Sequence, residues 1–168
     1  MLFLKLKTQM DTIIQNLKHV QQRIDETCKA AGRDPKEVKL LLATKTVSPE
    51  RIQQALAAGY TLIAENKVQE LKEKYEALKT TPHTNHFIGH LQTNKIKDIL
   101  KCEVSCVESL DRYDLAEKLH QKLSQAGREM DVFIQVNTSG EESKFGVAPE
   151  AALELTRQVA QLPTLHIR

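Results

Sequence analysis

Short apolar runs alternate with helix-like segments along most of this chain, and that alternation constrains the fold more than any other feature. The strand-like runs cover residues 38–45, 60–64, 86–90, 103–108, 131–137 and 165–167. Between them, apolar residues recur at spacings of three and four, as they do on one face of a helix. Strands separated by helices in this way pair in parallel through helical crossovers, so the sequence predicts an α/β fold.

Two architectures satisfy this alternation, a doubly wound open sheet and a (β/α) barrel of the TIM-barrel type. The segment Ser48-Pro49-Glu50 shows how a helix begins after a strand, with a hydroxyl, a proline and an acid in order. No predicted strand is followed by a GxGxxG turn or a GxxxxGK[ST] loop, which weakens the nucleotide-binding versions of the open sheet. Periodicity alone leaves both architectures open.

An additional helix precedes the first strand, over residues 7–31. Its apolar stripe consists of Met10, Ile13, Ile14, Leu17, Val20, Ile24 and Cys28. Residues 1–9 fit this pattern poorly, so we expect an unstructured leader, with Met10 as a natural start. We expect residues 1–168 to form a single domain, with the stripe packed on its core or against a partner helix.

Composition excludes several classes of function. Lys+Arg 24 against Asp+Glu 22 leaves a formal charge of +2, and Phe 4, Tyr 3 and Trp 0 offer little for base stacking, so we expect no nucleic-acid partner. No apolar run reaches the roughly 18–20 residues that span a bilayer, so we expect no membrane partner either. The cysteines, Cys28, Cys102 and Cys106, follow no disulfide framework, which predicts reduced thiols in a cytoplasmic protein.

Polar residues follow the predicted strands at their carboxyl ends, where parallel α/β folds bind ligands. In chain order they are Thr44, Lys45, Glu65, Asn66, His90, Glu108, Ser109, Asn137 and Thr138. Lys45 stands out because it ends a run of Val, Leu and Ala. Partial desolvation in such surroundings favours the neutral, nucleophilic amine that Schiff-base chemistry needs. The alternative is a solvated lysine that merely ends a strand.

Other chemistries are less well supported by the spacing. His83 and His86 would point to opposite faces of a strand, and His86 and His90 share a face without a neighbouring Asp or Cys. We therefore predict no metal site. Glu65 and Glu108 are the one pair of strand-end acids that could serve glycoside hydrolysis.

Four motifs at these strand ends nevertheless occur together in order. They are LLATKTVSPERI (Leu41–Ile52), AENKVQE (Ala64–Glu70), HFIGHLQTNK (His86–Lys95) and NTSGEESKFGV (Asn137–Val147). Together they closely resemble the pyridoxal 5′-phosphate (PLP) homeostasis protein family, whose fold is like the N-terminal barrel of alanine racemase. The resemblance covers nearly the whole chain from about Met10.

The resemblance implies a (β/α)8 barrel that holds PLP as an internal aldimine on Lys45, without turnover of a substrate. It also implies that Asn66 lies in the cofactor pocket, although Asn66 could instead cap the helix that follows. His90 and Asn137 would line the same barrel mouth. Lys144, in the matching SKFG segment, would contact phosphate or assist transfer of PLP to apo-enzymes, unless it is only a solvated loop lysine.

Two departures from the family qualify these expectations. The family often has a second lysine two residues after the Schiff-base lysine, where this chain has Val47. The chain also stops at Arg168, so we expect a C-terminally truncated barrel with about five to six of its eight strands, lacking the phosphate-binding loops. A PLP-dependent amino-acid racemase and a protein-interaction scaffold built on the first helix remain the alternative functions.

Overall fold

Six parallel strands form one sheet in the computed structural model, which describes residues 2–168, with side chains from residue 12 onward. The strands are β1 (Leu42–Ala43), β2 (Leu62–Glu65), β3 (Thr84–Phe87), β4 (Cys106–Leu110), β5 (Met130–Ile134) and β6 (Leu165–Ile167). They lie side by side in the order in which they occur along the chain. Doubly wound sheets reverse their strand order near the middle, whereas barrels do not, so the structure confirms a partial TIM-type barrel.

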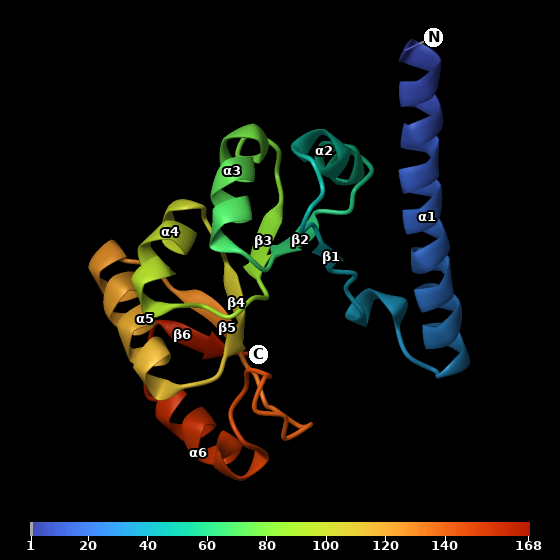
Figure 1. Cartoon of the computed structure of the whole chain (residues 1–168). Helices are drawn as coiled ribbons and strands as arrows, with labels where there is room; N and C mark the ends of the chain where they lie inside the picture. The colour runs from blue at the N-terminus through green and yellow to red at the C-terminus, as the bar shows by residue number, and fades with distance from the viewer. Residues whose placement is uncertain (1) are drawn as a thin grey trace.

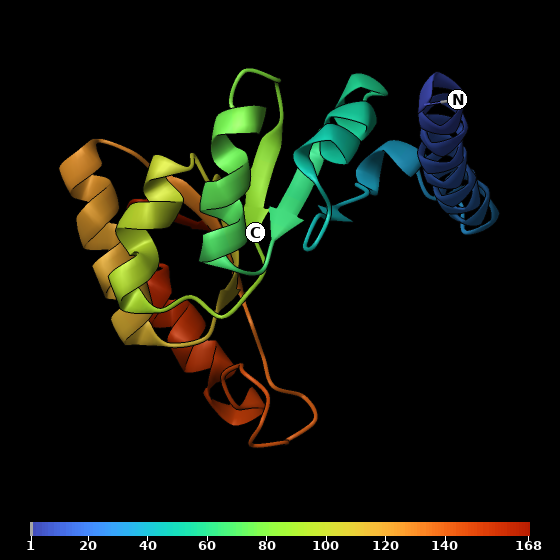
Figure 2. The same cartoon turned by 45° about the horizontal axis from the view of Figure 1, so that its top comes forward.

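Helices cover one face of this sheet, as Figures 1 and 2 show. They are α2 (Pro49–Ala57), α3 (Val68–Leu78), α4 (Ile96–Lys101) after the 3-10 turn η2 (Thr93–Lys95), α5 (Tyr113–Ala126) and α6 (Pro149–Val159). The main core lies between the sheet and α3 to α6, where Ile99, Val107 and Leu119 are fully buried. A smaller cluster under α2 includes Ile52, Leu56 and Ile63. The predicted alternation is therefore confirmed.

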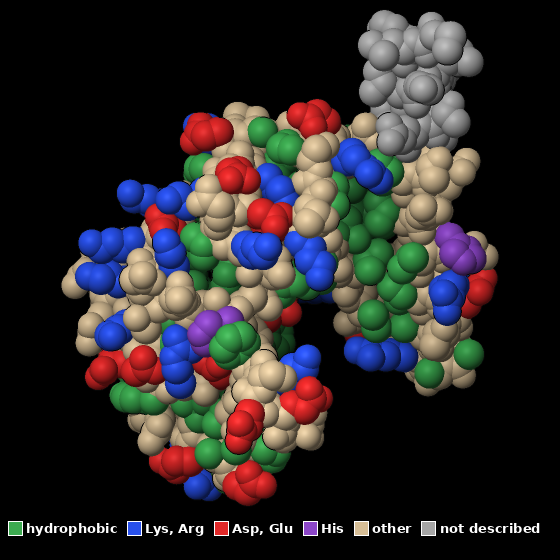
Figure 3. Space-filling view, in the orientation of Figure 1, with side chains coloured by type: hydrophobic (Ala, Val, Ile, Leu, Met, Phe, Trp, Pro, Cys, Tyr) green, Lys and Arg blue, Asp and Glu red, His purple; other side chains and the backbone are tan. Residues whose placement is uncertain are grey.

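The other face of the sheet, which we call the inner face, borders an open hollow of about 1050 Å³. Its lining includes Gln21 of the first helix and Leu62, His86 and Glu108 of the sheet. Figure 3 shows the molecule hollowed between the sheet domain and the first helix, with charges of both signs interspersed over the visible face. His86 and Glu108, which line this hollow, are polar groups that a closed apolar core would exclude.

The first strand is shorter and more open than its apolar run predicts. Of the strand expected over residues 38–45, only Leu42 and Ala43 pair with a neighbouring strand, and Ala43 is exposed. A nearly continuous apolar run such as 38–45 is typical of a strand buried on both faces, and β1 is not buried in this way. Within residues 2–168, β1 pairs with β2 alone, and the hollow on its inner side leaves that face uncovered.

Helix α1 (Leu2–Ala30) stands apart from the sheet and makes its main contacts with α2 and the 3-10 turn η1 (Pro35–Glu37). It begins at Leu2, so residues 2–9 continue the helix in place of the predicted unstructured leader; Met1 lies outside the described residues. Cys28 of its apolar stripe is buried, but Val20 remains 40% exposed. Among the helices that the structure describes, none combines the length and apolar character needed to cross a membrane.

Candidate functional site

Lys45 lies in a turn directly beyond the carboxyl end of β1. The turn closes through a hydrogen bond from the Val47 amide to the Thr44 carbonyl, 3.0 Å apart. The Lys45 side chain is exposed, so the partial desolvation expected from its apolar run is wrong. Within residues 2–168 no strand pairs with the other edge of β1, and the end of this strand is in contact with solvent. The amine is therefore accessible from the barrel mouth.

A buried ion-pair network anchors the residue before Lys45. Lys74 of α3, only 8% exposed, donates from Nζ to the Thr44 carbonyl at 2.8 Å and to Glu65 Oε1 at 2.7 Å. The Thr44 hydroxyl donates to the same carboxylate oxygen at 2.6 Å. Hydrogen-bonded buried charges hold their partners in one geometry, so this network ties β1, β2 and α3 together beneath the Lys45 turn.

The residue after Lys45 is held from the same helix. Thr46 has φ 62, a left-handed conformation that costs a non-glycine residue about 1–3 kcal/mol. Its amide donates to Glu70 Oε2 at 2.7 Å, and Lys74 Nζ lies 3.2 Å from the same oxygen. The Thr46 amide, and after it Lys74, hold the pKa of Glu70 below its usual range. Lys45 is therefore flanked by two tethered threonines while its own side chain remains free to react.

Asn66 packs against the loop after β3 at very close range. A Cβ atom on Gly89 would lie 1.9 Å from the Asn66 carbonyl oxygen, so only glycine permits this approach. The Ser109 hydroxyl donates to the Gly89 carbonyl from the next strand. The helix-cap alternative for Asn66 is wrong, because the N-cap of α3 is Lys67, without a side-chain hydrogen bond. Asn66 Oδ1 is instead buried without a hydrogen-bond partner among the described residues.

Asn66 and His90 border the same hollow, which has a volume of about 310 Å³. Lys67, Lys72 and Lys95 also line it, together with Asp98. Lys72 and Asp98 form an ion pair of 3.3 Å across it. The structure thus brings two of the predicted site residues together in a cationic pocket, and Lys45 does not line that pocket.

The loop after β5 folds back onto the end of β3. The Phe145 ring stacks on His90 with their centroids 3.8 Å apart and their planes at 14°. His90 Nδ1 lies 3.7 Å from Asp111 Oδ2, beyond hydrogen-bond distance, and has no hydrogen-bond partner among the described residues. Sequence reasoning missed Phe145, although the SKFG segment contains it. The stack places the neighbouring Lys144 close to the His90 loop.

The Asn137 side chain stabilises this loop through hydrogen bonds to other residues of the loop. Its Nδ2 donates to the carbonyls of Glu141 at 2.9 Å and Lys144 at 3.4 Å. Its Oδ1 accepts from the Ser139 hydroxyl at 3.0 Å and the Gly140 amide at 3.2 Å. These four bonds use the hydrogen-bonding capacity of the amide. Asn137 therefore shapes the loop that presents the exposed Lys144.

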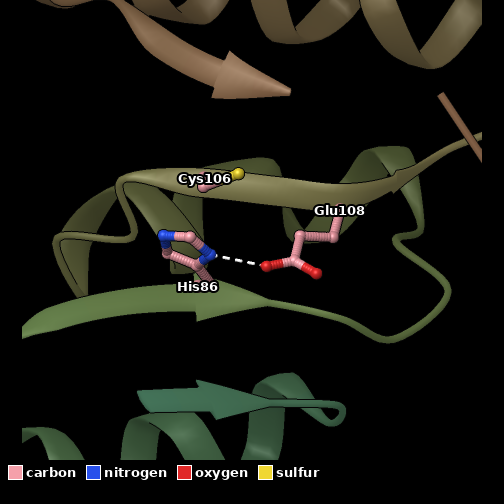
Figure 4. Close-up of side chains that lie close together, drawn as sticks. All are labelled: His86, Cys106 and Glu108. Atoms are coloured by element: carbon pink, nitrogen blue, oxygen red, sulfur yellow. Dashed lines mark hydrogen bonds and ion pairs between the residues drawn. The ribbon is translucent and has the colours of Figure 1, made fainter. Parts of the chain in front are cut away.

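Three metal-ligating side chains meet on the inner face of the sheet, as Figure 4 shows. His86 of β3 and Cys106 and Glu108 of β4 offer ligand atoms that all lie within 4.8 Å of one another. His86 thus has a cysteine and an acid beside it, contrary to the expectation from local sequence. Glu65 bonds to α3 on the opposite face of the sheet, so Glu65 and Glu108 cannot act as a paired acid and base.

The thiols are free and buried in the structure, as expected. Cys102 belongs to the core on the helical side of the sheet, whereas Cys106 lies beside the inner hollow. Burial, with the nearby charges of Glu108 and Asp131, raises the pKa of Cys106 to about 12. Such a thiol is protonated at neutral pH unless a cation binds beside it.

Comparison with known proteins agrees with the family resemblance of the four motifs. The profile of the alanine racemase N-terminal domain matches residues 9–168. A pyridoxal phosphate homeostasis protein of Aquifex aeolicus is 42% identical over 153 residues, which cover 91% of this chain and 67% of that protein. The described chain therefore spans about two thirds of its relative's length.

Solved structures of similar sequence superpose on this chain. A protein of Bifidobacterium adolescentis, described as unknown, superposes with a TM-score of 0.88 at 34% identity, covering 95% of this chain and 68% of that one. PipY of Synechococcus elongatus, solved with PLP bound, superposes with a TM-score of 0.74 at 28% identity, covering 86% and 67%. Both structures contain the arrangement of parallel strands and helices described above.

Proposed function

This chain belongs to the alanine racemase N-terminal domain family and, within it, to the pyridoxal phosphate homeostasis proteins, and on that premise we propose that it binds PLP through Lys45. Its role is to hold the cofactor without turning over a substrate. The aldehyde of PLP supplies the group with which a lysine amine condenses, with loss of water. We propose the cytoplasm as the location, since all three cysteines are free thiols, as is usual for proteins of that compartment.

The observation that carries this proposal is the clamped turn around Lys45. The Thr44 carbonyl and the Thr46 amide are each held by α3, through Lys74 and Glu70. Lys45 between them is exposed at the carboxyl end of the sheet, where barrels bind their ligands. A fixed backbone with a free amine favours one reactive position among the many lysines of this chain. Covalent mapping of PLP, described in the Discussion, is the direct test.

Racemisation is the competing function, because alanine racemase shares this fold. It requires an acid and a base on opposite faces of the cofactor. The two acids that bond to the residues flanking Lys45 are already paired, Glu70 with Thr46 and Glu65 with Lys74. We therefore expect no racemisation when PLP-loaded protein is incubated with a panel of amino acids, and measurable turnover would favour the enzyme.

Asn66 is proposed as a second cofactor contact, because it follows β2, the strand paired with β1, at the carboxyl end of the sheet, and its buried Oδ1 has no hydrogen-bond partner among the described residues. We expect Asn66→Ala to weaken PLP binding about tenfold, the value of one lost hydrogen bond of about 1.4 kcal/mol. Its free energy of unfolding should change by less than about 0.5 kcal/mol, since no cap is lost. Absorbance titration and urea unfolding measure the two effects. Asn94→Ala, at an exposed position in η2, is the control and should change neither.

Lys144 is proposed to assist release of PLP to apo-enzymes, because the Phe145–His90 stack holds its loop at the barrel mouth. We expect Lys144→Ala to slow transfer of PLP to an apo-enzyme several-fold while the cofactor still attaches at Lys45. Recovery of the acceptor's activity after mixing measures the rate. Lys118→Ala, an exposed lysine on α5, is the control. An unchanged rate in Lys144→Ala would leave Lys144 as a solvated loop residue.

A further inference from the structure

The inner face of the sheet carries a row of metal-ligating side chains that is separate from the Lys45 turn. The strand register aligns His86 with Cys106, Cys106 with Asp131, and Asp131 with His166. Residues paired in a parallel ladder project to the same face, so this row crosses four neighbouring strands. Glu108 adds a carboxylate two residues further along β4, again on the inner face.

Two members of this row, Asp131 and His166, already have other charged partners. Asp131 forms an ion pair with Arg168 at 3.0 Å, and His166 Nε2 lies 2.7 Å from Glu129. His86, Cys106 and Glu108 remain as a compact group, in which His86 Nδ1 lies 2.6 Å from Glu108 Oε1. The proposed ligands therefore number three.

We propose that His86, Cys106 and Glu108 form a binding site for Zn²⁺. Imidazole nitrogen, thiolate sulfur and carboxylate oxygen are the donors that Zn²⁺ takes in proteins. Zinc lies about 2.3 Å from sulfur and about 2.0 Å from nitrogen or oxygen, so tetrahedral ligands are about 3–4 Å apart. Ligand atoms already within 4.8 Å need only small side-chain rotations to reach this spacing.

The cluster is also accessible to a metal ion. The side chains of His86 and Glu108 are 16% and 29% exposed, and both border the open hollow of about 1050 Å³. Binding releases the Cys106 proton to water and leaves a thiolate on the metal. Three protein ligands leave the fourth position to a water molecule from the hollow.

Binding of Co²⁺, a spectroscopic substitute for Zn²⁺, to the whole chain tests this site. Thiolate coordination produces an intense near-ultraviolet charge-transfer band, which added Zn²⁺ should abolish by displacing Co²⁺. We expect Cys106→Ser to lose the band, and His86→Gln and Glu108→Gln to weaken Zn²⁺ affinity about tenfold or more. Cys102→Ser and His83→Gln, which change the same residue types outside the cluster, should bind like the parent.

Several outcomes would overturn the site. They are the absence of a charge-transfer band in the parent protein, its persistence in Cys106→Ser, or its loss in Cys102→Ser. Circular dichroism shows whether each variant is folded. If Cys106→Ser does not fold, the His86→Gln and Glu108→Gln variants provide the test. Unchanged Zn²⁺ affinity in those folded variants would refute the proposal. PLP capture at Lys45 is measured separately, because this site does not depend on the proposed function.

Discussion

Lys45→Ala should lose covalent capture of PLP. In the parent protein, borohydride reduction after incubation with PLP should place the pyridoxyl group on Lys45, as peptide mapping would show. Lys45 is the exposed amine between two threonines held by α3, so no other described lysine shares its backbone setting. We expect labelling at the remaining lysines to stay at the low level of nonspecific surface reaction.

Lys36→Ala is the matched control, since Lys36 is also exposed and lies in η1, away from the carboxyl ends of the strands. It should capture PLP like the parent. Labelling spread evenly over surface lysines in the parent, or undiminished in Lys45→Ala, would refute attachment at this residue. Circular dichroism of Lys45→Ala should match the parent, because an exposed side chain contributes little to stability.

Lys74→Met should have the largest effect on stability. The ammonium group donates to Thr44, Glu65 and Glu70 from a largely buried position. Removing one partner of a buried ion pair costs about 3–5 kcal/mol, because the other charge is left uncompensated. Glu65, 2% exposed, would be that charge. Urea unfolding should reveal the loss, and PLP capture at Lys45 should slow in the fraction that remains folded.

Two further variants separate this network from a general effect of losing a helical lysine. Lys72→Met removes an ammonium from the same helix at a 50% exposed position and should cost no more than about 1 kcal/mol. Glu65→Gln combined with Lys74→Met removes both charges and should recover part of the stability. Equal losses in Lys72→Met and Lys74→Met would contradict the network.

Much of the fold could be predicted because its signals are local. Helix α3 lies between the predicted strands over residues 60–64 and 86–90, where Val68, Leu71 and Leu78 recur at helical spacing, and α2 begins at Pro49 behind Ser48. The alternation also predicts parallel pairing, which places Lys45, Asn66 and His90 at one edge of the sheet. The length of β1 could not be predicted, because an apolar run does not reveal whether its inner side will be covered.

The sequence by itself determined the parallel α/β alternation, the motifs of the family and the strand ends at which Lys45, Asn66, His90 and Asn137 lie. Only the tertiary structure decided which distant side chains meet. The Lys74 network, the His90–Phe145 stack and the His86–Cys106–Glu108 cluster each join separate elements. Helix and strand patterns arise from contacts between near neighbours, whereas these groups depend on strand register and loop path, which the whole chain sets by packing.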